Sequence, residues 1–162
     1  MAHDTYIGID NGTTGSIGVI NRRGSRLYKT PIKNELNYTK AKKFINRVDG
    51  EALKKILEEN SVGSTFLILE RPMIDPMRWV ASVSAIRCLE ATLIVIESLS
   101  LSYIYADSRD WQSVMLPSGL VKDELKKASL QIGKRLFSKI DFKGYKDADS
   151  LLMAEYCKRK GL

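Results

Sequence analysis

Four carboxylates in this chain have the residue type and the placement that hydrolysis of phosphate esters requires. Asp10 and Glu70 each close an apolar stretch typical of a strand, and Asp147 and Asp149 open a helical pattern near the C-terminal end. Carboxylates gathered at one place repel one another, and their pKa values rise unless a cation lies among them. Mg²⁺ prefers such oxygen ligands, and two ions about 3.5–4 Å apart can activate water and stabilise the leaving oxygen.

Three of these carboxylates, Asp10, Asp147 and Asp149, also have an ordinary structural explanation. Asp10 precedes Asn11 and Gly12, so it can cap a tight turn. Asp147 and Asp149 can cap the last helix or complement the dipole in its first turn. Both interpretations remain open for each residue taken alone, and the whole pattern is more specific than any member of it.

The elements that must position these residues begin with a strand, turn and strand over Tyr6–Ile20, in which Asn11, Gly12 and Gly15 supply the reversal. Leu27–Ile32 predicts a third strand, and Pro31 makes it an edge or ends it early. The polar segment Lys33–Arg47 has no clear assignment. It holds a basic cluster that is either a solvated face or a DNA contact, formed by Lys40, Lys42, Lys43 and Arg47.

The second half of the chain alternates between strand and helix patterns. The run Thr65–Glu70 is continuously apolar up to its carboxylate, which suits a strand buried on both faces. If this strand neighbours the first one, Asp10 and Glu70 leave the sheet at the same edge. The other predicted elements are a helix from Asp49 to about Asn60, a helix over Met77–Ser98, a strand over Ser102–Ala106, a helical turn over Trp111–Leu116, a helix over Lys122–Phe137 and a last helix from Asp147.

Three antiparallel strands followed by strands that alternate with helices predict an α/β fold. We expect a mixed sheet of about five strands, with helices packed on its faces. The length of 162 residues suits one domain over residues 1–162.

The net charge of +7 favours a polyanionic partner. The excess is uneven, because residues 122–162 hold 11 basic and 6 acidic side chains. Such a basic C-terminal quarter is typical of a nucleic-acid-binding face.

Nothing in the sequence predicts secretion or a membrane span. The longest apolar run, around Ala91–Ile96, is too short to cross a bilayer, and the first residues lack the pattern of a signal peptide. We therefore expect a cytoplasmic protein. Cys88 and Cys157 are expected to be reduced and buried, and a single histidine, His3, gives poor support to a zinc hydrolase.

Three motifs resemble the RuvC-type Holliday junction resolvases, in particular a phage or phage-like member. They are Ile7-Gly8-Ile9-Asp10, Leu69-Glu70 and Asp149-Ser150-Leu151-Leu152-Met153-Ala154, and the similarity covers nearly the whole chain. The resemblance implies an RNase H-like fold and a homodimer. It also implies two Mg²⁺ ions, replaceable by Mn²⁺, that support paired nicks in four-way DNA. Y-forks and flaps are further candidate substrates, and a phage-encoded member would act in the host cytoplasm.

The resemblance also assigns roles to the acidic residues. Asp10, Glu70 and Asp149 would be catalytic metal ligands. Asp147 ranks below them, because the family separates its two C-terminal carboxylates by about one helical turn and here they are two positions apart. Asp147 can still bind metal if it precedes the first turn.

The DNA-binding residues implied by the resemblance lie in a loop and along a basic helix. Met73 could be an apolar wedge that enters the junction, or it packs within its loop. Lys122 could also stabilise charge at the scissile phosphate. A solvated helix face is the alternative for the other lysines of the helix. The expected set is Arg71, Met73, Lys122, Lys126, Lys127, Lys134 and Lys146.

Two other functions compete with a nuclease. The stretch Gly8–Ser16 also resembles the phosphate loop of actin, sugar kinases and heat-shock ATPases, but the sequence has no second phosphate loop. A catalytically inactive protein that binds branched DNA is the other alternative, and its retention of four carboxylates would weaken phosphate binding without metal. For the nuclease we expect the helix Met77–Ser98 to contribute to the dimer interface.

Overall fold

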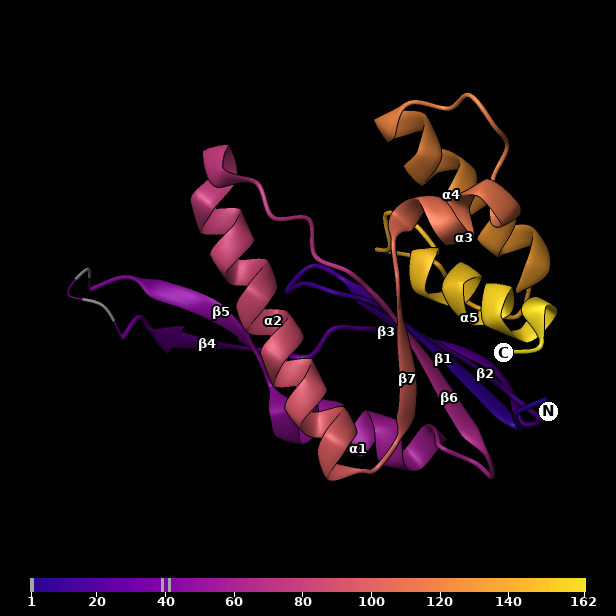
Figure 1. Cartoon of the computed structure of the whole chain (residues 1–162), viewed down its shortest axis with the longest axis horizontal. Helices are drawn as coiled ribbons and strands as arrows, with labels where there is room; N and C mark the ends of the chain where they lie inside the picture. Colours follow the sequence, from indigo (N-terminus) through magenta and orange to yellow (C-terminus); the bar gives the residue numbers. More distant parts are fainter. Residues whose placement is uncertain (1, 39, 41) are drawn as a thin grey trace.

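The computed structural model describes residues 2–38, 40 and 42–162 and contains the predicted mixed sheet of five strands. The strands lie in the order β3-β2-β1-β6-β7, with β1, β2 and β3 antiparallel and β6 and β7 parallel to β1 (Figure 1). Their bounds are β1 Thr5–Asp10, β2 Ser16–Asn21, β3 Gly24–Lys29, β6 Thr65–Glu70 and β7 Ser102–Ala106.

The pairing of β1 with β6 decides where the site forms. The two strands run parallel with Ile9 beside Leu69, so the next residues, Asp10 and Glu70, leave the sheet at the same edge. Leu67, Ile68 and Leu69 of β6 are buried, on both faces of the sheet, as their continuous run predicts, and Phe66 is partly buried.

Helices cover both faces of the sheet (Figure 1). One face packs against α1 (Gly50–Asn60) and α2 (Trp79–Ser98), and the other against α3 (Ser108–Met115), α4 (Lys122–Leu136) and α5 (Asp149–Lys160). Asp49 caps α1 as predicted, because its side chain accepts a hydrogen bond from the Ala52 amide at 3.1 Å. The 3₁₀ turn η1 (Pro76–Arg78) precedes α2, so the predicted long helix begins as a tighter turn.

The beginning of α5 lies directly on β1 and β2, where two residues have no side chain. A Cβ atom on Gly18 would lie 2.4 Å from the Leu151 nitrogen, and one on Gly8 would lie 2.0 Å from the Ser150 oxygen. Both distances are far below van der Waals contact, so only glycine permits this approach. The two glycines thereby fix the first turn of α5, with Asp149, beside the end of β1.

The strand predicted over Leu27–Ile32 is present with different bounds, as the edge strand β3 over Gly24–Lys29, and the sequence analysis made no assignment for the polar segment that follows it. The predicted strand Leu27–Ile32 breaks at Thr30 and Pro31, since Pro31 has no amide to continue the ladder. The following polar segment forms a separate two-stranded sheet of β4 (Ile32–Leu36) and β5 (Phe44–Val48). This hairpin projects from the body beside α2 (Figure 1), so its strands lack the alternation that one buried face imposes. Residues 39 and 41 of the predicted basic segment lie outside the described residues.

One segment is a weak exception to the expectation that nothing in the chain could span a membrane. The continuous helical stretch Pro76–Ser98 has 23 residues and is long and apolar enough to do so by length and composition. This is weak support for a membrane span, because a core helix passes the same test. Cys88 and Ile96 pack against the sheet, and the stretch carries the charged residues Arg87 and Glu90.

Candidate functional site

The structure brings the four predicted carboxylates into one electrostatic group. Burial raises the pKa of Asp10 well above its ordinary value, and the charges on Glu70, Asp149 and Asp147 raise it further, as does a side-chain hydrogen bond with Glu70. Burial and the charge of Asp147 raise the pKa of Asp149 to about 7, although hydrogen bonding to Ser129 opposes the shift. Asp10 and Asp149 are therefore ionised at a cost that a cation would remove.

Glu70 is held by α3, which follows the neighbouring strand. The Ser108 hydroxyl donates a hydrogen bond to Glu70 Oε1 at 2.5 Å, and the Trp111 indole nitrogen donates to the same oxygen at 3.4 Å. Trp111 is fully buried. The sequence analysis missed both partners and predicted only a helical turn over Trp111–Leu116. The start of a helix immediately after a strand end, with Asp107 as its cap, is the signal that could have indicated them.

Asp149 and Asp147 are held by the start of α5 and by α4. Ser129 donates a hydrogen bond to Asp149 and accepts one from the Ala148 amide at 3.1 Å. Asp147 precedes the helix, which begins at Asp149, and its side chain accepts a hydrogen bond from the Asp149 amide at 3.3 Å. The objection that two-residue spacing places the carboxylates on different helix faces therefore does not apply. Ser129 is a further residue that the sequence analysis did not identify.

A cleft of about 620 Å³ opens beside these carboxylates. Asp10 and Asp147 line it together with the predicted DNA-binding residues Lys126 and Lys146, and Lys29 adds a cation that the sequence analysis did not single out. Lys126 Nζ lies 3.8 Å from Asp147 Oδ2. The cleft therefore contains both carboxylates that can bind a cation and lysines that can bind phosphate.

The donor set fits a hard divalent cation in its chemistry. Asp10 and Glu70 meet through a hydrogen bond that a cation can replace. Asn11 Oδ1 lies buried at the cleft without a hydrogen-bond partner among the described residues, which leaves one more oxygen donor. As the side chains stand, no three Asp, Glu, His or Cys residues in the described part of the chain converge on one metal position. Binding would thus require the carboxylates to draw together.

The remaining predicted DNA-binding residues lie outside the lining of this cleft. Lys122, Lys127 and Lys134 are exposed along α4. Arg71 forms an ion pair with Asp107 at 3.4 Å, beside the strand end that carries Glu70. Met73 is 85% exposed, so it does not pack within its loop, and its role as a wedge stays a prediction.

Comparison with solved structures identifies the fold. RuvC from Thermus thermophilus in complex with a Holliday junction substrate superposes with a TM-score of 0.64 at 12% identity, covering 98% of this chain and 97% of that chain. A second Thermus thermophilus RuvC structure gives 0.60 at 13% identity, covering 97% and 96%. The yeast mitochondrial Holliday junction resolvase Ydc2 gives 0.52 at 12% identity, covering 96% and 79%.

The resemblance to RuvC-type resolvases is therefore confirmed at the level of the fold, which is RNase H-like with a mixed five-stranded sheet. No family model and no curated protein matches the sequence. A phage origin stays a prediction.

The raised pKa values predict how stability responds to pH without metal. The pKa of Asp149 is about 7 in the folded protein and 3.8 in its ordinary state. Its contribution to the stability of the folded state is therefore fully present below pH 3.8 and is lost as the pH rises through about 7. In EDTA we expect the free energy of unfolding to fall between pH 5 and pH 8, by about 2–4 kcal/mol from Asp149 alone. Thermal unfolding at both pH values measures it.

The Asp10→Asn variant is the control for this prediction. It removes the charge of Asp10, so its unfolding temperature should fall less between pH 5 and pH 8, and Mg²⁺ at pH 8 should stabilise it less than the unmodified protein. Equal pH dependence in both proteins would show that the carboxylates do not interact as described.

Proposed function

We propose that this chain is a divalent-metal-dependent endodeoxyribonuclease that hydrolyses phosphodiesters in four-way and other branched DNA. The observation that carries the proposal is the electrostatic coupling of Asp10 to Glu70, Asp147 and Asp149, beside a cleft lined by Lys126 and Lys146. The likeness of the whole fold to solved junction resolvases, one of them in complex with a Holliday junction substrate, supports the substrate class. The proposal treats residues 1–162 as one nuclease domain.

In this proposal Asp10, Glu70 and Asp149 hold two Mg²⁺ ions, with Asp147 as an additional ligand. When bound, the ions supply an activated water and stabilise the leaving oxygen. Mn²⁺ can take their place, since it also suits carboxylate and water ligands.

The other residues of the proposed site orient ligands and bind the substrate. Ser108 and Trp111 keep one oxygen of Glu70 in place, and Ser129 does the same for Asp149. Lys126 and Lys146 bind phosphates in the cleft, while the exposed lysines of α4 extend the positive surface. Lys122, at the first position of α4, is proposed to stabilise charge at the scissile phosphate.

A homodimer would place two such sites on a two-fold junction, so that paired nicks resolve it. Helix α2 supports this because large apolar side chains are exposed along it. Val80 is 81% exposed and Ile94 is 64% exposed. Burying exposed apolar side chains of a helix against a second copy is a common basis for a stable symmetric interface.

Neither alternative function is favoured by an observation of its own. The turn after Asp10, which resembles an ATP phosphate loop, lies among three further carboxylates that would repel nucleotide phosphates. An inactive DNA-binding protein would have no use for hydrogen bonds that orient Glu70 and Asp149.

The direct test of the proposed function is the Asp10→Asn variant on end-labelled four-way, Y-shaped and linear DNA. Asn keeps the size of Asp but is a weaker ligand for Mg²⁺, so cleavage of branched DNA should fall at least about 100-fold. Binding should stay equal or tighten, because the variant removes a negative charge near DNA. A gel-shift titration beside a cleavage time course, with Mg²⁺ and with EDTA, measures both.

Glu51→Gln, which neutralises an exposed carboxylate in the first turn of α1, is the matched control and should cleave normally. Near-normal cleavage by Asp10→Asn would show that Asp10 is not a required metal ligand, and its role as a turn cap would then be the better explanation. Equal cleavage of linear and branched DNA by the unmodified protein would contradict the proposed substrate class.

The proposed dimer is tested by Ile94→Glu. A charge in the centre of an apolar interface should raise the dimer dissociation constant at least about 10-fold, measured by sedimentation at micromolar concentration. Leu136→Glu, at an exposed apolar position on α4, is the control and should leave the constant unchanged. A monomer in the unmodified protein, both free and on DNA, would contradict the dimer.

A further inference from the structure

The β4–β5 hairpin carries a large share of the positive charge of the chain. Residues 33–47 contain five basic side chains and one acidic side chain, against a net charge of +7 for the whole protein. None of these residues belongs to the cleft or to α4, so the proposed nuclease site does not account for them. Such a concentration of charge on a projecting element requires its own explanation.

The charges are distributed unevenly along the hairpin. Lys33 pairs across the ladder with Arg47, and both bind Glu35, at 3.0 and 2.7 Å, so part of the charge near the base is neutralised. Lys42 and Lys43 lie toward the other end, are exposed, and form no ion pair among the described residues. Positive charge is therefore most available away from the body of the protein.

The hairpin is braced at two points. At its base Val48 is buried in the core, and the Asp49 amide donates to the Pro31 carbonyl at 2.9 Å. Nearer the tip, Arg87 of α2 donates a hydrogen bond to the Tyr38 hydroxyl at 3.2 Å and lies 5.9 Å from the centre of its ring. A braced element loses less conformational entropy on binding than a free loop.

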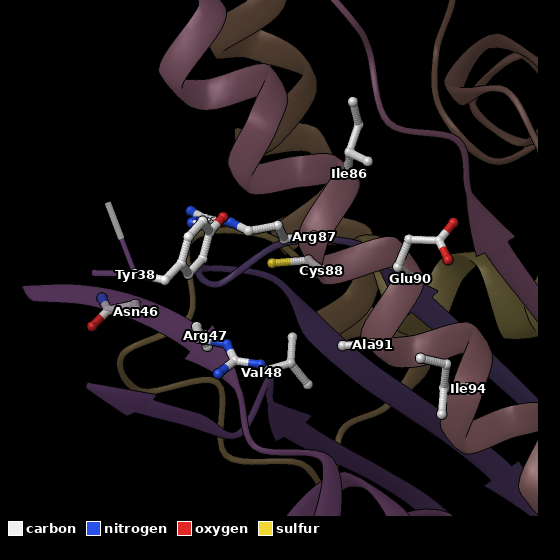
Figure 2. Close-up of a pocket in the computed structure, with 10 residues that line it drawn as sticks. All are labelled: Tyr38, Asn46, Arg47, Val48, Ile86, Arg87, Cys88, Glu90, Ala91 and Ile94. Atoms are coloured by element: carbon white, nitrogen blue, oxygen red, sulfur yellow. Dashed lines mark hydrogen bonds between the residues drawn. The ribbon is translucent and has the colours of Figure 1, made fainter. Parts of the chain in front are cut away.

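Figure 2 shows how this brace is built. Arg87 extends from α2 toward the Tyr38 ring, above a depression of about 390 Å³ whose lining also includes Val48 and Ile94. The depression separates the hairpin from α2 along part of its length, and the Arg87–Tyr38 contact spans it. The hairpin is thus held away from the helix as an arm.

The base of the arm is continuous with the active-site cleft. Ile32, the first residue of β4, lines the same cleft as Asp10, and so does Thr30. The Thr30 amide donates to the Gly15 carbonyl at 3.1 Å, which ties the start of the arm to the turn that follows Asp10. Lys33 is the next residue along the strand. A DNA strand in the cleft would therefore meet the arm as it leaves.

We propose that the β4–β5 hairpin is a DNA-binding arm that grips the sugar-phosphate backbone of duplex leaving the cleft. A two-stranded β-ribbon has the width to follow a DNA groove. Lys42 and Lys43 bind phosphates, while exposed apolar side chains such as Phe44 lie against sugars or base edges. The arm extends the proposed nuclease function, in that its DNA is the substrate of the same site.

A second copy of the chain is the competing occupant, because Leu36 and Phe44 pair on one face of the arm and are both exposed. The positive charge of the arm argues against a contact between the arms of two copies. Two arms of the same positive sign would repel each other, and the arm itself offers only Glu35, which is already bound by Lys33 and Arg47. A phosphate backbone complements every free charge on the arm.

The test is the double variant Lys42→Ala/Lys43→Ala, with Lys54→Ala/Lys55→Ala as its control. The control removes the same charge from α1, where each lysine forms an ion pair with a glutamate one turn later. Affinity for a four-way junction and for linear duplex is measured by fluorescence anisotropy in EDTA, between about 50 and 200 mM salt, so that cleavage does not intervene. The arm variant should bind about 10-fold more weakly, and its plot of log affinity against log salt should be flatter by about two units.

Two further measurements keep the outcomes distinct. Circular dichroism should show equal thermal unfolding of both variants, since the exchanged lysines are exposed. Sedimentation should show the same oligomeric state for both. Equal salt slopes for the arm variant and the control would overturn the proposal. Failure of the unmodified protein to bind DNA would also overturn it. A changed dimer dissociation constant in the arm variant, with unchanged DNA binding, would overturn it as well and would assign the arm to contact with a second copy.

Because binding is measured without metal, the arm and the nuclease can fail separately. A flatter salt slope in the arm variant, together with no cleavage of branched DNA by the unmodified protein in Mg²⁺, would contradict the nuclease and retain the arm. Cleavage of branched DNA by the unmodified protein, together with an unchanged salt slope in the arm variant, would contradict the arm and retain the nuclease.

Discussion

Repulsion among Asp10, Glu70, Asp147 and Asp149 is the interaction on which the other features of the site depend. Burial removes the water that would screen these charges, so the pKa values of Asp10 and Asp149 rise and ionisation becomes costly. A ligand that binds the ionised carboxylates would offset this cost of ionisation. In the proposed function a divalent cation would do so and would supply the chemistry of phosphodiester hydrolysis, whereas a buried hydrogen-bonded proton between Asp10 and Glu70 would offer no catalysis by itself.

The rest of the structure holds these charges together against their repulsion. Parallel pairing of β1 with β6 sets Asp10 and Glu70 at the same edge, and the missing side chains of Gly8 and Gly18 let the start of α5 lie directly on the sheet. Hydroxyl groups of Ser108 and Ser129 then fix individual oxygens. Away from these carboxylates, basic side chains lie in the cleft, along α4 and on the β4–β5 hairpin, as the proposed polyanionic substrate would require.

Sequence reasoning predicted the central sheet and the positions of Asp10 and Glu70 well, because long apolar runs that end in carboxylates give a strong local signal. It could not predict Ser108 or Ser129 as partners, since their contacts join residues 38 and 20 positions apart and a single serine has no distinctive pattern. The β4–β5 hairpin was missed for a different reason. A strand with no face in the core lacks the alternation by which strands are identified. The helix Met77–Ser98 was expected to contribute to an interface, but the particular side chains that stay exposed, such as Val80 and Ile94, depend on which side of α2 the sheet covers.

The central claim is that Asp10 and Glu70 share a divalent cation, and crystals grown with Mn²⁺ test it most directly. Anomalous scattering locates Mn²⁺ without assumptions about the surrounding chemistry. The account predicts a peak bonded to carboxylate oxygens of both residues, at about 2.0–2.4 Å, with Asp149 at that ion or at a second one nearby. A peak elsewhere, with Asp10 and Glu70 still hydrogen-bonded to each other, would contradict it.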